Sequence, residues 1–188
     1  MLEAPSGATG RRAAFTLLEL LAVTALIAIL AGIVLGVGRR ASDAGRIARA
    51  RAELAALSVA LEGYRRAQGD YPRTDDESRL LQSLIGKRDP ANTAISGRAQ
   101  LEPARFVIAR LAAPGIPVDP FAVVDSALVD PWGRPYVYVY KVPAGGWANS
   151  GFVLCSAGPD GKDSGALLPG GFADSAPPEN ADNIYANP

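Results

Sequence analysis

The sequence predicts an α+β protein in which one long N-terminal helix packs on a small antiparallel sheet, followed by a C-terminal loop. Three observations predict this fold class. An apolar run of membrane length lies near the N-terminus, and an apolar stripe with a helical period continues it. Tyrosines at alternating positions later in the chain predict a strand. The 188 residues have room for one domain and an appendage.

The apolar run occupies residues 15–38 and contains one charged side chain, Glu19. Its uncharged part, residues 20–38, would span about 28 Å as a helix, close to the thickness of a hydrocarbon core. A cleaved secretory signal and a plain membrane anchor are two interpretations. The run is longer than the core of a signal peptide, and a plain anchor leaves Glu19 unexplained. A carboxylate in such a segment is expected to have a function and a partner.

The long helix is predicted from residue 16 to residue 67, because no proline interrupts residues 6–71. Beyond the apolar run, apolar residues recur at steps of three and four, which places them on one helical face. Gly69 and Pro72 predict the end of the helix. We expect the stripe to pack on the sheet, and it consists of Ile47, Ala50, Leu54, Leu57, Leu61 and Tyr64.

Shorter elements follow the long helix. Thr74, with a glutamate three residues later, predicts a capping box for a short helix that presents Leu80, Leu81, Leu84 and Ile85. Residues 87–102 are expected to form a polar loop, and residues 103–113 another short helix.

An Asp-Pro-Trp-Gly turn at residues 130–133 is predicted to open into a strand in which Tyr136, Tyr138 and Tyr140 alternate with valines. Residues 151–156 are expected to return as its antiparallel partner. A stacking platform for nucleic acid is the other interpretation of these tyrosines, but little basic charge lies near them.

The composition argues against several function classes. A formal net charge of zero argues against nucleic acid as a main partner. The absence of histidine removes the commonest general base and the commonest metal ligand, so no enzymatic activity is expected. The single cysteine, Cys155, cannot form an intramolecular disulfide. The charge is uneven, because residues 39–66 hold seven arginines and three acids, whereas residues 142–188 hold five acids and one lysine.

Residues 14–19, Ala-Phe-Thr-Leu-Leu-Glu, and the apolar helix after them resemble the N-terminal signal of type IV pilins and type II secretion pseudopilins. The resemblance implies that a prepilin peptidase cuts between Ala14 and Phe15 and methylates the new N-terminus of Phe15. Glu19 then becomes the fifth mature residue. Its carboxylate would neutralise the N-terminal amine of a neighbouring subunit in a filament, which makes it an assembly contact. Ala14 departs from the glycine that is usual before the cut.

Three later stretches are similar to the major pseudopilin of type II secretion systems, the G-type pseudopilin. They are residues 64–81 after the long helix, residues 130–136 in the turn, and residues 156–161 with 181–184 in the C-terminal loop. Residues 87–129 fit this family least well and look like an expansion. The resemblance therefore implies a type IV pilin-like fold.

The resemblance also implies a domain organisation, a location and partners. The chain would be a single-pass bacterial inner-membrane protein with a cytoplasmic N-terminus, extracted into a periplasmic fibre that drives protein secretion. Its partners would be other copies of itself through the N-terminal helix, the prepilin peptidase, an inner-membrane assembly platform and minor pseudopilins. The implied segments are a leader at residues 1–14, a transmembrane and assembly helix at 15–38, and a periplasmic globular domain at 39–188.

The acidic C-terminal loop is the candidate metal site, because the major pseudopilin of this family binds calcium there. Ca²⁺ takes six to eight oxygen ligands, which flexible acidic loops can supply. The loop after Gly161 is longer than usual, so Asp163 or Asp174 could substitute for a ligand. Asn183 stands where a second aspartate is usual, and a solvated loop without metal is the alternative. The ligands implied by the resemblance are the Ala157 carbonyl, Asp160, Asp182 and Asn183.

Three other functions are weighed against a secretion pseudopilin. A subunit of a type IV pilus, for adhesion, motility or DNA uptake, is the nearest, although such subunits often carry a C-terminal disulfide loop that one cysteine cannot make. A membrane-anchored periplasmic enzyme lacks the expected catalytic residues. A monomeric ligand-binding domain would use the N-terminal signal only for export.

Overall fold

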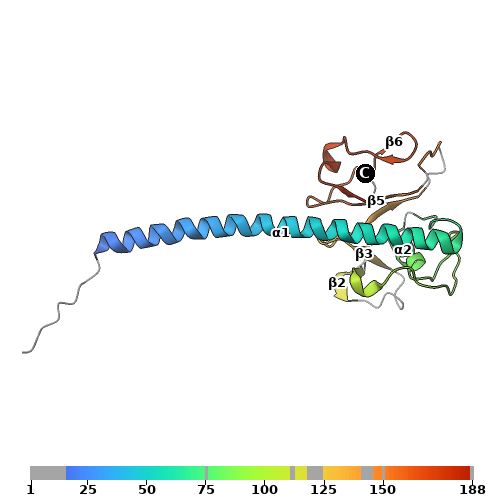
Figure 1. Cartoon of the computed structure of the whole chain (residues 1–188), viewed down its shortest axis with the longest axis horizontal. Helices are drawn as coiled ribbons and strands as arrows, with labels where there is room; N and C mark the ends of the chain where they lie inside the picture. The colour runs from blue at the N-terminus through green and yellow to red at the C-terminus, as the bar shows by residue number, and fades with distance from the viewer. Residues whose placement is uncertain are drawn as a thin grey trace, which may run out of the picture. The chain divides into compact units, whose positions relative to one another are not determined.

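The structure is a computed structural model that describes residues 16–74, 76–110, 113–117, 125–140, 146–149 and 151–186. The chain divides into two compact units, Met1–Ser42 and Asp43–Pro188. Two α-helices, two 3₁₀ turns and eight short strands are assigned in the described residues, and the paired strands are antiparallel. This arrangement, shown in Figure 1, confirms the predicted α+β class and the type IV pilin-like fold.

Helix α1 spans Leu17–Gln68, so the predicted long helix is confirmed to within one residue at each end. In the second unit, five of the six predicted stripe residues are buried and Ile47 packs against them at partial exposure. Gly69 then adopts a φ of +86°, a conformation that favours glycine and ends the helix. The Gly69 N–H donates to the Arg65 carbonyl at 2.8 Å, which closes the last turn.

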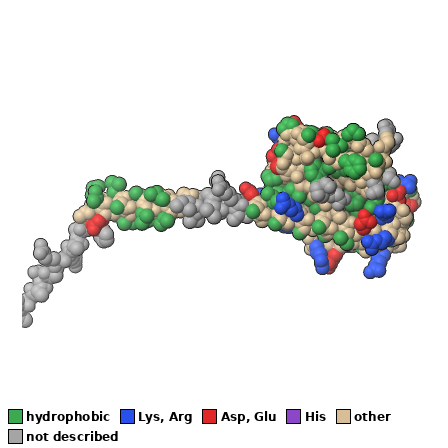
Figure 2. Space-filling view, turned by 45° about the horizontal axis from the view of Figure 1, so that its top comes forward, with side chains coloured by type: hydrophobic (Ala, Val, Ile, Leu, Met, Phe, Trp, Pro, Cys, Tyr) green, Lys and Arg blue, Asp and Glu red, His purple; other side chains and the backbone are tan. Residues whose placement is uncertain are grey.

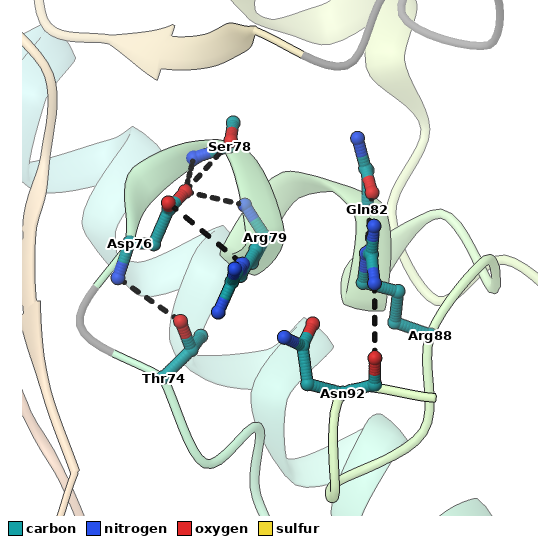
Figure 3. Close-up of polar contacts among 7 residues, drawn as sticks. All are labelled: Thr74, Asp76, Ser78, Arg79, Gln82, Arg88 and Asn92. Carbon is teal, nitrogen blue, oxygen red and sulfur yellow. Dashed lines mark hydrogen bonds and ion pairs between the residues drawn. The ribbon is translucent and has the colours of Figure 1, made fainter. Parts of the chain in front are cut away.

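Helix α2 spans Glu77–Leu84, and the predicted capping box on Thr74 is wrong. Asp76 is the N-cap instead, since its Oδ1 accepts the N–H groups of Ser78 at 2.9 Å and Arg79 at 3.0 Å (Figure 3). Thr74 Oγ1 accepts the Asp76 N–H at 3.0 Å. Partial burial alone would raise the pKa of Asp76, but hydrogen bonds from Ser78 and Arg79 lower it overall. The four predicted apolar residues are buried: Leu80, Leu81, Leu84 and Ile85.

The first sheet has the strand order β2-β1-β3. Its strands are β1 (Val107–Arg110), β2 (Ala113–Pro117) and β3 (Ser126–Val129). The helix predicted at residues 103–113 is wrong, because within the described residues of that range only the 3₁₀ turn Pro103–Arg105 is helical. The residues after that turn form β1, which pairs along its length with β3. The segment that looked like an expansion, residues 87–129, therefore supplies all three strands of this sheet.

The second sheet has the order β4-β5-β8, with β4 at Val137–Val139, β5 at Val153–Ser156 and β8 at Ile184–Tyr185. Val137 pairs with Cys155, which confirms the predicted antiparallel strand pair. A small separate hairpin joins β6 (Leu167–Leu168) to β7 (Phe172–Ala173). In the view of Figure 1, α2 and β3 lie on one side of α1, and β5 and β6 on the other.

Tyrosines link α1 and the segment after it to the rest of the second unit. Tyr136 and Tyr138 are buried in the core, so their rings are not a surface for stacking bases. The Tyr136 hydroxyl donates to the buried Glu53 of α1 at 2.5 Å, and Glu53 also accepts from Arg49 at 2.7 Å. The Tyr138 hydroxyl donates to the Pro72 carbonyl at 2.9 Å. These contacts hold the second sheet against the helix and the segment that follows it.

Candidate functional site

The N-terminal part of α1 exposes large apolar side chains, which Figure 2 shows in green on the visible face of the helix. Their exposed fractions run from 79% at Leu17 to 51% at Val23. Apolar surface of this extent normally marks a site of interaction with a partner or a membrane. Among the described residues, no helix is both long enough and apolar enough to cross a membrane.

Glu19 and Thr16 form a reciprocal cap at the start of α1. The Thr16 N–H and hydroxyl donate to Glu19 Oε2 at 2.9 Å and 3.0 Å, and the Glu19 N–H donates to Thr16 Oγ1 at 3.2 Å. This is the capping-box arrangement, in which each side chain satisfies a backbone donor of the other residue. Our sequence interpretation missed this role of Thr16, although the spacing of Thr and Glu just before an apolar run is its usual signature.

The cap leaves one oxygen of Glu19 available. Both bonds from Thr16 reach Oε2, and within the described residues Oε1 accepts no hydrogen bond. A carboxylate can accept donors at both oxygens. The geometry therefore lets Glu19 keep its own helix cap and still accept a further donor, such as an amine. The predicted cleavage residues, Ala14 and Phe15, lie outside the described residues.

The Asp-Pro-Trp-Gly turn is organised by a buried carboxylate, Asp130. Its Oδ1 accepts the N–H groups of Trp132 at 2.9 Å and Arg134 at 3.0 Å. Its Oδ2 accepts the Ser156 hydroxyl at 2.5 Å, and Ser156 Oγ accepts the Gly158 N–H at 3.2 Å. The turn is thereby connected to the start of the C-terminal loop.

Arg134 makes the second connection between this turn and the loop. Its Nη1 donates to the Gly158 carbonyl at 2.9 Å, and the guanidinium lies over Gly161. A Cβ at Gly161 would fall 1.9 Å from Arg134 Cζ, and Gly161 has a φ of +71°. Both facts require glycine at this position, because a side chain would collide with the guanidinium and strain the backbone.

The predicted calcium ligands occupy one end of the C-terminal loop. The Asp160 N–H donates to Asp182 Oδ2 at 2.9 Å, so two implied ligands lie side by side. The Asn183 amide donates to Asp163 Oδ1 at 3.1 Å, so a third implied ligand contacts a possible fourth. Asp174 instead caps its own turn through the Ala176 N–H, at 2.9 Å. The Ala157 carbonyl accepts the Gly161 N–H at 3.1 Å.

One buried atom in this region lacks a partner. Asn183 Nδ2 must face Asp163, because a carboxylate only accepts hydrogen bonds, and Asn183 Oδ1 is then buried without a hydrogen bond in the described structure. A buried carbonyl oxygen of this kind is the ligand type that Ca²⁺ prefers. No group of three or more carboxylate, thiolate or imidazole side chains in the described residues is arranged to hold a metal. The oxygen donors present are of the type that Ca²⁺ takes, and they lie as two contacting pairs, Asp160 with Asp182 and Asp163 with Asn183.

Comparison with known proteins gives a family match and a similar curated protein. The family described as the prokaryotic N-terminal methylation motif matches residues 9–35. The chain is 26% identical over 157 residues to the type II secretion system core protein G of Pseudomonas aeruginosa, covering 83% of this chain and 89% of that protein. No solved structure matches the chain.

The matched motif contains the predicted cleavage residues and Glu19, and the similarity to the secretion protein runs through both units. The pilus alternative is not favoured, because the relative is by its name a core protein of a secretion system. The chain thus carries a prepilin-type N-terminus on a type IV pilin-like fold and is similar over most of its length to core protein G, the G-type pseudopilin of type II secretion.

Proposed function

We propose that this chain is the major pseudopilin of a type II secretion system, a subunit that polymerises into a periplasmic pseudopilus and drives protein secretion. The methylation motif at residues 9–35 and the similarity to core protein G support this proposal. The work is mechanical, since each added subunit lengthens the fibre beneath the cargo, and no catalytic step is involved.

The observation that carries the proposal is Glu19 beside an exposed apolar helix surface. A single copy leaves residues 17–32 exposed, so lipid or other copies must cover them. A carboxylate enters such surroundings at a high free-energy cost unless a cation pairs with it. The Phe15 amine of a neighbouring copy, released by cleavage after Ala14, would supply that cation, and Glu19 Oε1 is available to accept it.

The location and partners follow from this proposal. Residues 1–14 would be the cytoplasmic leader, removed by a prepilin peptidase, and residues 15–38 would hold the subunit in the inner membrane as a single span. The globular domain would lie in the periplasm. An inner-membrane assembly platform and minor pseudopilins would start and extend the fibre.

Replacing Glu19 tests the proposal. Glu19→Ala should still be cleaved to a chain that begins at Phe15, as mass spectrometry would read, but it should form few or no fibres. The control is Thr16→Ala, which removes the hydroxyl of the cap and keeps the carboxylate. If capping were the only role of Glu19, both variants would assemble equally poorly. Normal fibres from Glu19→Ala would overturn the pairing role.

We further propose that the C-terminal loop binds calcium through Asp160, Asp182, Asn183 and the Ala157 carbonyl, with Asp163 as the additional carboxylate. The partnerless Asn183 Oδ1 supports this assignment. Bound calcium would hold the two ends of the loop together. Asp174 is the less suitable substitute, because its side chain accepts from its own turn.

Thermal unfolding with calcium and with a chelator tests the metal proposal. Calcium at about 100 times its dissociation constant should add about 2.7 kcal/mol to the free energy of unfolding. Asp182→Asn should abolish most of this gain, and the matched control Asp174→Asn should retain it. An unchanged midpoint in the wild type would contradict calcium binding and leave the fibre proposal standing.

A further inference from the structure

The hairpin formed by β6 and β7 presents an apolar pair to solvent. Leu168 and Phe172 are directly paired across the two strands, so their side chains lie on the same face. They are 46% and 48% exposed. In Figure 1, β6 lies at the periphery of the second unit. Two adjacent large apolar side chains on a two-stranded hairpin gain stability when another surface covers them.

The outward face of α1 in the same unit carries a complementary surface. Arg51, Ala55, Val59 and Arg66 lie within about 80° of arc, at helical spacings of four, four and seven residues. Glu62 shares this arc, but its carboxylate already pairs with Arg65 and accepts the Tyr71 hydroxyl. Val59 is 72% exposed. Of the ion pairs found among the described residues, none involves Arg51 or Arg66, whereas Arg49 and Arg65 are paired within the helix. An apolar centre therefore lies between two unpaired cations.

The segment that carries the hairpin has the opposite charge. Residues 142–188 hold five acids and one lysine. In the described part of the chain, none of those acids forms an ion pair. Glu179 is exposed in the 3₁₀ turn Pro178–Asn180, a few residues after β7. The segment thus carries an exposed apolar pair on the hairpin and an exposed acid a few residues further along the chain, which suits the apolar centre and cations on α1.

We propose that the β6–β7 hairpin of one subunit packs on the outward face of α1 of a neighbouring copy in the fibre. Leu168 and Phe172 cover Val59, and Glu179 pairs with Arg51 or Arg66. The contact joins two different surfaces, so it is heterologous and propagates as an open polymer instead of closing a dimer. The inference rests on the proposed fibre function and adds to it a second interface, outside the apolar N-terminal helix.

Cysteine crosslinking in assembled fibres tests the contact. The double variant V59C/F172C should give a ladder of covalent dimers, trimers and larger species under oxidation, because each subunit joins two neighbours. V59C and F172C alone should remain monomeric. The control V59C/V107C places the second thiol on another exposed valine, in β1, and should give no ladder. Fibres of V59C/F172C without a ladder, or a ladder from the control, would overturn the proposal.

Charge reversal provides a test without cysteines. E179R should lower the yield of assembled fibres, counted by electron microscopy, at least threefold, and adding R51E or R66E should restore it. The control R105E reverses an exposed arginine whose pairing is local, with Glu102, and should leave the yield unchanged. Wild-type yield from E179R, or loss without rescue by either partner, would overturn the contact. Failure of the wild-type chain to form any fibre would overturn the proposed function itself.

Discussion

The buried bond between Tyr136 and Glu53 allows a quantitative prediction. Tyr136→Phe removes the hydroxyl that donates to Glu53 at 2.5 Å and leaves the ring in the core. Burial, together with the Glu53 carboxylate, raises the pKa of the Tyr136 hydroxyl, so this group keeps its proton and acts as the donor. Hydrogen bonds to charged groups contribute about 1.5–3 kcal/mol. Glu53 keeps its bond to Arg49, so we expect a loss of about 2 kcal/mol in the free energy of unfolding.

Urea unfolding of the full chain in detergent, followed by tryptophan fluorescence, measures this loss. The control is Tyr185→Phe, which removes a hydroxyl that donates at 3.3 Å to the Asp174 carbonyl, and it should cost less than about 1 kcal/mol. A Tyr136→Phe variant within about 0.5 kcal/mol of the wild type would refute the argument that this bond holds β4 against α1.

Four further predictions have defined outcomes. Leu57→Ala should lower the free energy of unfolding by about 2–5 kcal/mol, whereas Val59→Ala on the outward face should change it by less than about 0.5 kcal/mol. Asp76→Ala should cost about 1 kcal/mol near pH 7 and Asp76→Asn much less. Folding lowers the pKa of Asp76, so its charge stabilises the folded state above the unfolded pKa of about 3.9. This stabilisation disappears as the pH falls through the lower pKa of the folded state. Thermal unfolding of both Asp76 variants over a range of pH checks this. Burial raises the pKa of the Cys155 thiol to about 12, so iodoacetamide at pH 8 should modify it only after unfolding, as mass spectrometry would read. Gly161→Ala should lower the thermal midpoint, and an unchanged midpoint would contradict the observed position of the Arg134 guanidinium.

The long helix and the tyrosine strand were predictable because each has a strong local period. Helical spacing over six apolar residues identified the buried face of α1, and a period of two identified β4. The helix predicted at residues 103–113 failed because Val107 and Ile108 suit either element over so short a run. Long-range pairing of β1 with β3 decided the outcome, and single-residue patterns carry no information on such pairing.

The candidate sites likewise contain residues that local spacing predicts and contacts that it does not. Local spacing identified Glu19, and the same spacing contains the Thr16 cap that we missed. The loop network depends on contacts between residues far apart in the chain, such as Arg134 with Gly158, so no local pattern could give it. The N-cap of α2 was misplaced because Thr74 and Asp76 are both good capping residues and lie two positions apart. The β6–β7 hairpin was not predicted either, because its strands are only two residues long.

The most direct test of the fibre proposal is an electron cryo-microscopy reconstruction of fibres assembled from this chain. Our account predicts that each mature subunit begins at Phe15 and that its N-terminal nitrogen lies within about 4 Å of Glu19 Oε1 of a neighbouring subunit, the distance of an ion pair. Fibres in which the leader is retained, or in which Glu19 contacts only its own Thr16, would contradict that account.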